Sequence, residues 1–177
     1  MYLLNEKVVY PGHGVAKINR IIEKIISGNS TIFYELKFLN KEMTILIPTD
    51  NIVPTGIRKL SSEECIDVIF KVLAEPEIHL HKEACNTNWN KRSKQYQFKL
   101  RSGDLLEISK IYKDLQYIGQ HKELSFGERT LLLQIENLLA EEISLVKNVI
   151  EQQAVEQLRS FFAINHKPSH NQPKAYM

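Results

Sequence analysis

VPTGIR, residues 53–58, is the stretch at which the chain changes character. Short segments rich in branched and aromatic residues precede it, whereas helix-capping motifs and helical hydrophobic spacing follow it. Because proline and glycine interrupt regular structure, the stretch is typical of a linker. It predicts a β module over residues 1–58 and an all-α helical module over residues 59–165. Residues 166–177 carry two prolines and little apolar surface, so we expect a disordered tail there.

The first module reads as a series of short strands separated by turn residues. Tyr34, Leu36 and Phe38 alternate with charged residues, which is the period of a half-buried strand. The predicted strands cover residues 7–10, 15–26, 31–39 and 43–48. Strands of this length joined by short turns bury themselves as a small curled antiparallel sheet or barrel. The sequence therefore predicts an α+β protein.

The second module carries two helix-start signals. Ser61 to Glu64 and Ser125 to Glu128 each read as a capping box, in which the first serine accepts from the backbone of the glutamate three residues later. The first predicted helix should end before Pro76. Further helices are predicted over residues 88–100, 104–119 and 151–164.

The composition excludes several classes of protein. The chain has 177 residues, 43% of them hydrophobic, but no run of about 18 apolar residues that could span a membrane. Residues 1–7 show no signal peptide, so we expect a cytoplasmic protein without a membrane partner. Cys65 and Cys85 are too few and too isolated for a disulfide framework and are expected to be reduced thiols.

No enzyme motif is present. The chain lacks a phosphate-binding loop, a dinucleotide fingerprint and a nucleophile elbow. His79, His81 and Cys85 lack a fourth ligand at a suitable spacing, so a metal-dependent enzyme is the least favoured alternative. Glu141 and Glu142 adjoin on one helix and project about 100° apart, which does not make a catalytic pair. We expect no catalysis, no cofactor and no metal.

One local charge run does point to a partner. The net charge is only +2, yet residues 88–101 contain five cations and no acid. The only tryptophan, Trp89, lies at the start of this run among polar neighbours. Cations can neutralise phosphates while an aromatic ring stacks on bases or wedges between them, so the run favours contact with nucleic acid. The alternative is that Trp89 is an ordinary core residue.

Five segments resemble one family. Val8 to Ala16, with the sequence VVYPGHGVA, resembles the opening signature of the CarD/CdnL bacterial transcription regulators, a module that also occurs in transcription-repair coupling factor. Four later segments are similar to the same family and follow in the same order. They are residues 43–48 with Asn51, residues 87–89 with Arg92, residues 102–104, and residues 124–128.

The resemblance implies a Tudor-like N-terminal β-barrel that binds the β subunit of bacterial RNA polymerase. It also implies a helical domain that touches promoter DNA at the upstream edge of the transcription bubble and stabilises the open complex. Trp89 would be the minor-groove wedge, and Asn88 would cap its helix or contact DNA. The implied phosphate contacts are Arg92, Lys94 and Arg129, and the implied polymerase contacts are Lys24, Leu46 and Pro48. The protein would be a monomer, associated with the nucleoid through the polymerase.

Two positions depart from the family pattern, and two other functions stay open. Some relatives have arginine where this chain has Leu46, and an aromatic residue is common where it has Ser93. One alternative is a protein-interaction adaptor without a DNA role. Another is an RNA-binding module of ribosomal type, which would need surface aromatics, although Tyr34 and Phe38 share a face with Leu36.

Overall fold

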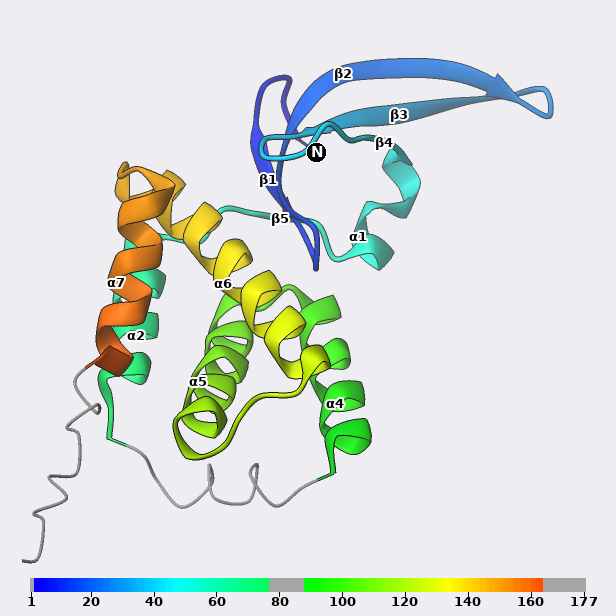
Figure 1. The fold of residues 1–177 in the computed structure, drawn as a ribbon. Helices are drawn as coiled ribbons and strands as arrows, with labels where there is room; N and C mark the ends of the chain where they lie inside the picture. Colours follow the sequence, from blue (N-terminus) through cyan, green and yellow to red (C-terminus); the bar gives the residue numbers. More distant parts are fainter. Residues whose placement is uncertain (1, 77–87, 164–177) are drawn as a thin grey trace, which may run out of the picture.

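The computed structural model describes residues 2–76 and 88–163 and contains a sheet followed by a helical bundle (Figure 1). Five strands pair antiparallel in the order β4-β3-β2-β1-β5. Their bounds are β1 Lys7–Tyr10, β2 Gly14–Ile26, β3 Asn29–Phe38, β4 Thr44–Pro48 and β5 Arg58–Lys59. The predicted four strands are therefore present, with one short strand added.

The sheet is open in the part of the chain that the structure describes, so a closed barrel is not shown. β4 and β5 form its two edges. The chain between these edges does not form a strand: residues 49–51 make a 3-10 turn, and Ile52–Thr55 makes the single-turn helix α1. The linker prediction over residues 53–58 is wrong at its end, because Arg58 belongs to β5 and pairs with Val9.

The β2–β3 hairpin is long and projects away from the helices (Figure 1). A register shift between Ile18 and Arg20 bends it, as a β-bulge does. Before the bulge, Ile18 and Leu36 of the hairpin pack with Val8 of β1 in the core of the sheet. Beyond the bulge, the hairpin carries isoleucines that are exposed, namely Ile21, Ile25, Ile26 and Ile32.

Over residues 63–76 and 88–163 the second module contains the helices α2 Glu63–Ala74, α4 Trp89–Ser102, α5 Leu105–His121, α6 Phe126–Lys147 and α7 Glu151–Ala163. Helix α5 lies among α2, α4 and α6 (Figure 1), and its fully buried residues include Ile111 and Leu115. The helices share one core that is separate from the core of the sheet. Two cores in one chain indicate two modules.

The two capping predictions had different outcomes. Ser125 and Glu128 form the predicted capping box at the start of α6. At α2 the prediction is wrong by one residue, because Ser62 accepts from the backbone N of Cys65. Ser61 instead donates its backbone N–H and its hydroxyl to Glu142, both at 2.8 Å. Ser61 therefore binds a carboxylate 81 positions away in the sequence and does not cap α2.

Several expectations fall outside the residues described. His79, His81, Cys85 and the tail over 166–177 lie there, and so their predictions remain untested. Within residues 2–76 and 88–163, no His, Cys, Asp or Glu side chains form a group of three that could hold a metal. No helix in these ranges combines the length and hydrophobicity that a bilayer span requires.

Candidate functional site

The N-terminal ends of α4 and α6 meet at an open groove of about 580 Å³. Four of the five residues predicted to contact DNA line it: Asn88, Trp89, Arg92 and Arg129. The remaining lining residues are Lys122, Glu123, Leu124, Ser125 and Glu128. Tertiary structure thus brings together residues that lie up to 41 positions apart in the sequence.

Both helices are fixed at this groove by side-chain caps. The side chain of Asn88 accepts from the backbone N of Asn90 at 2.9 Å, so Asn88 caps α4. Ser125 and Glu128 cap α6 reciprocally, at 2.9 and 3.3 Å. The N-terminus of a helix carries a partial positive charge, so two such ends favour a negatively charged partner.

Trp89 is neither a fully buried core residue nor a fully exposed one. It packs against the helical core and is half-buried. Its ring lies over Gly127 at the start of α6, so closely that a Cβ added at Gly127 would come within 3.2 Å of the indole Nε1 and Cζ2 atoms. The polar residues beside Trp89 in sequence were therefore a poor guide to its contacts, because the packing partners come from α6.

Arg92 differs most from its expected role. Its side chain is only 4% exposed and forms an ion pair with Glu128, whose side chain is also 4% exposed. Burial raises the pKa of Glu128, but hydrogen bonds from Ser125 and the charge of Arg92 outweigh burial and leave that pKa below its usual value. In this arrangement the Arg92 guanidinium is committed to Glu128 rather than presented on the surface.

Other cations near this pair do reach the surface. The side chain of Arg129 is 58% exposed and lies 3.6 Å from Glu123. Lys122 is exposed at the end of α5 and lines the groove, although the sequence analysis did not select it. Lys94 is exposed on the face of α4 opposite the core, with Lys91, Arg101 and the 78% exposed Phe98. It does not line the groove.

The predicted polymerase contacts share one face of the sheet. Cross-strand partners point to the same side, and β3 pairs Glu35 with Leu46 and Phe33 with Pro48. On β2, Lys24 pairs with Thr31, two residues from Phe33 along β3, which places Lys24 on that same side. We call these three residues the outer sheet patch. Leu46 is 39% exposed on the edge strand β4.

The two modules meet at a joint where strands β2 and β5 contact helix α6. Arg58 binds both carboxylate oxygens of Glu142 and donates through Nε to the carbonyl of Gly103 at 2.7 Å. Gly14 has φ +101°, and a Cβ there would lie 2.2 Å from Glu141 Oε2. The joint therefore needs glycine for both its backbone angle and its close approach.

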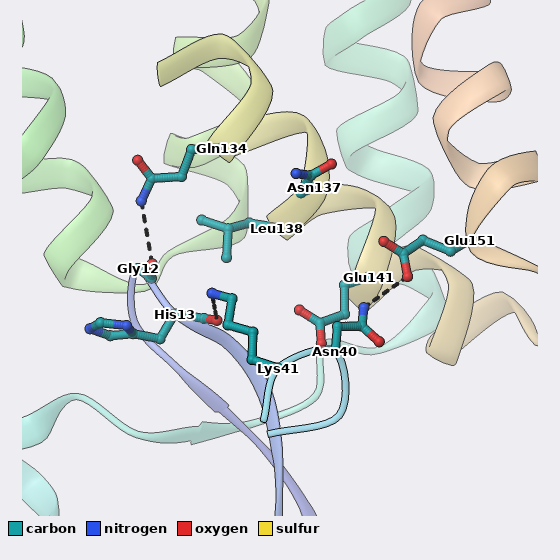
Figure 2. A pocket seen from close by; sticks show the side chains of 9 residues that line it. All are labelled: Gly12, His13, Asn40, Lys41, Gln134, Asn137, Leu138, Glu141 and Glu151. Carbon is teal, nitrogen blue, oxygen red and sulfur yellow. Dashed lines mark hydrogen bonds between the residues drawn. The ribbon is translucent and has the colours of Figure 1, made fainter. Parts of the chain in front are cut away.

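Beside the joint lies a polar cavity of about 280 Å³, lined by Gly12, His13, Asn40, Lys41, Gln134, Asn137, Leu138, Glu141 and Glu151. Figure 2 shows the loops of the sheet facing α6 and the start of α7 across it. Asn40 donates to Glu151 at 2.8 Å and Gln134 to the carbonyl of Gly12 at 3.4 Å. Burial raises the pKa of Glu141 to about 6. These bonds tie the sheet to both α6 and α7.

Both modules match known protein families. Residues 3–61 match the CarD-like/TRCF RID domain, and residues 68–159 match the CarD C-terminal domain. The chain belongs to the CarD family. A relative from Bacillus subtilis (strain 168), named "Putative transcription factor YdeB", is 25% identical over 154 residues, which are 86% of this chain and 97% of the relative. The resemblance found in the sequence is thus confirmed, and CarD membership suggests interaction with RNA polymerase and regulation of transcription.

No motif in the sequence marks the residues that join the modules of this CarD-family chain. The sequence predicts only that Glu141 and Glu142 do not form a catalytic pair; in the structure they contact two different strands of the sheet module. The available signal was their place in an otherwise apolar stretch of α6, where two adjacent carboxylates must find partners to be buried. Arg58, in the stretch taken for a linker, is the partner of Glu142.

Proposed function

We propose that this CarD-family protein regulates transcription by bridging bacterial RNA polymerase and promoter DNA. The outer sheet patch binds the β subunit, and the groove between α4 and α6 contacts DNA at the upstream edge of the bubble. Bound in this way, the protein stabilises the open promoter complex. The observation that carries the proposal is the groove itself, which gathers Trp89, Arg129 and two helix N-termini in one place.

The groove suits a bent or partly opened duplex. A half-buried indole at the rim can wedge against an unstacked base step, and such wedges favour a kinked minor groove. Arg129 and Lys122 can neutralise phosphates on either side of that step. A protein that binds the open promoter better than the closed one shifts the equilibrium by that difference in affinity and by no more.

The outer sheet patch suits a protein partner. An edge strand presents unpaired backbone groups that another strand can bind, and β4 is such an edge. Leu46 supplies an apolar contact where some relatives have arginine. The polymerase contact would then depend on backbone pairing and apolar packing more than on an ion pair.

Tethering explains how a nearly neutral protein can act on DNA. Binding to the polymerase raises the effective concentration of the groove near the promoter, so weak DNA contacts suffice. The joint holds the groove at a set position relative to the outer sheet patch. A mobile connection would give up part of this advantage, because an unrestricted module spends most of its time away from the DNA.

The test is the lifetime of the open complex formed by polymerase, promoter and the full-length protein. Trp89→Ala should shorten this lifetime while leaving retention on immobilised polymerase unchanged. Phe98→Ala is the matched control, because Phe98 is an exposed aromatic residue of the same helix outside the groove. Equal lifetimes for Trp89→Ala and wild type at matched salt would overturn the DNA role and favour the adaptor alternative.

A further inference from the structure

The Trp89 ring lies against Gly127 of α6 and near Arg92 of its own helix. Three indole atoms, Cζ2, Nε1 and Cε2, lie 3.2 to 3.3 Å from the position that a Cβ at Gly127 would occupy. The guanidinium carbon of Arg92 lies 5.8 Å from the centre of the ring. The indole therefore lies against the side-chain-free Gly127 of α6 and near the Arg92 cation of α4.

That cation is part of a buried network. Arg92 Nη2 donates to Glu128 Oε1, while Glu128 Oε2 accepts from the backbone N of Ser125 at 2.9 Å. The two oxygens of one carboxylate thus serve two tasks. One caps α6 and the other binds α4, so the network fixes the start of each helix relative to the other.

The burial of this pair limits what Arg92 can do. An ion pair with both side chains 4% exposed is stable only while each partner satisfies the other, and breaking it strands a buried charge. For Arg92 to reach a phosphate, its guanidinium would have to move out of its buried position beside Glu128. Arg129 and Lys122 can contact phosphates without such a cost, because both are already exposed.

We infer that Arg92 and Glu128 are positioning residues, whose ion pair holds the Trp89 indole against Gly127 at the rim of the groove. Arg92 is not itself a phosphate contact. The inference rests on the proposed function, because DNA contact by Trp89 is what makes the pose of its ring matter. It replaces the role that the family resemblance implied for Arg92.

Fluorescence of the free, full-length protein tests the positioning directly. Trp89 is the only tryptophan, so the emission maximum and acrylamide quenching report on this ring alone. Arg92→Gln and Glu128→Gln should each shift the emission to the red and increase quenching. Glutamine at position 128 retains an acceptor for the capping box, so the second variant isolates the ion pair. Arg129→Gln, which leaves the network intact, should show the wild-type emission.

Salt dependence of binding to the polymerase–promoter complex separates positioning from phosphate contact. On duplex DNA, log affinity falls as log salt rises, and each phosphate contact adds about 0.9 to the size of this negative slope, which we call the salt slope. Arg129→Gln should lower the slope by about that amount. Arg92→Gln should lower the affinity and leave the slope unchanged. A slope reduced by about one in Arg92→Gln, with wild-type fluorescence, would overturn the inference.

Gly127→Ala provides a test that does not depend on removing a buried charge. It keeps Arg92, Glu128 and every exposed cation, but its methyl group must push the indole by a few tenths of an ångström. It should alter Trp89 emission and shorten the open-complex lifetime, again without changing the salt slope. A wild-type lifetime for Gly127→Ala despite altered emission would show that ring position does not matter and would overturn the inference.

The outcomes also separate this inference from the proposed function. If Trp89→Ala leaves the open-complex lifetime unchanged, the DNA role fails, whatever the fluorescence shows. If Trp89→Ala shortens the lifetime but Arg92→Gln and Glu128→Gln leave both emission and lifetime as in wild type, only the positioning role fails. Circular dichroism identifies a variant that has unfolded, in which case Gly127→Ala decides the question.

Discussion

Arg58 of β5 and Glu142 of α6 form a bidentate ion pair across the joint, with Nη1–Oε1 at 2.6 Å and Nη2–Oε2 at 2.8 Å. The Glu142 side chain is 2% exposed and also accepts two hydrogen bonds from Ser61. One carboxylate therefore binds the last strand of the sheet module and the segment that leads into α2. This contact connects the sheet module to the helical module.

Arg58→Met should destabilise the protein by about 3 kcal/mol, the lower end of the cost of breaking a buried ion pair, because it leaves the Glu142 charge buried with only Ser61 to satisfy it. Urea unfolding of the full chain measures this change. The matched control is Arg20→Gln, which breaks the Arg20–Glu35 pair on the sheet surface, where the Arg20 side chain is 70% exposed. Loss of that pair should cost less than about 1 kcal/mol. Equal costs for the two variants would contradict a special role for the joint.

Gly14→Ala should destabilise the protein more than Gly12→Ala does. Both glycines have positive φ, so alanine strains the backbone at each position. Only at position 14 does the new Cβ also meet Glu141, at 2.2 Å, whereas nothing lies within 4 Å at position 12. Unfolding free energies measured in a Glu141→Ala background should bring the two variants closer together. An unchanged difference in that background would assign the whole effect to backbone strain.

Glu141 should make the stability of the joint depend on pH. Its pKa is about 6 in the folded protein against 4.5 in the unfolded chain, so the folded state binds the proton more tightly. Stability contributed by this group therefore falls as pH rises from about 4.5 to above 6, by roughly 1–2 kcal/mol. Glu141→Gln lacks this titration.

The measurement for Glu141 is the difference in unfolding free energy between Glu141→Gln and wild type across that pH range. The difference should grow in favour of the variant as pH rises. Taking the difference removes the effect of other carboxylates, such as Glu107 and Glu128, whose lowered pKa values add stability with the opposite pH dependence. A flat difference would show that Glu141 does not titrate in this range.

Leu46→Asp should weaken retention of the full-length protein on RNA polymerase. A charge at this edge position opposes burial against an apolar partner surface. Leu133→Asp is the matched control, because Leu133 is an exposed leucine on α6. Polymerase pull-down with both variants gives the comparison. Retention of Leu46→Asp at the wild-type level would remove Leu46 from the proposed interface.

Lys94→Gln tests whether the outward face of α4 extends the DNA contact beyond the groove. If Lys94 contacts a phosphate in the open complex, the substitution should lower the salt slope of binding by about 0.9. Lys71→Gln serves as the control, because Lys71 is an exposed cation on α2 that neither lines the groove nor belongs to the sheet. An unchanged slope for Lys94→Gln would confine the phosphate contacts to the groove.

Local sequence signals were sufficient for most of the elements. Alternation over residues 31–39 predicted β3, and the Ser125–Glu128 capping box predicted the start of α6. Such signals work because strand alternation, turn residues and helix caps depend on neighbours a few positions apart. The family signature added the partner classes and proposed the contact residues, although it did not state what surrounds each side chain.

What the sequence by itself determined is the family and the order of most of the elements, with strands first and helices after them. Only the tertiary structure decided that Arg92 is buried against Glu128, 36 positions away, and that Arg58 meets Glu142, 84 positions away. The physical reason is that an arginine or lysine has the same residue type and charge in the sequence whether it is solvated or buried in the fold. Whether a cation is available to a partner depends on the desolvation and pairing that packing imposes, and packing joins residues that are far apart in the chain.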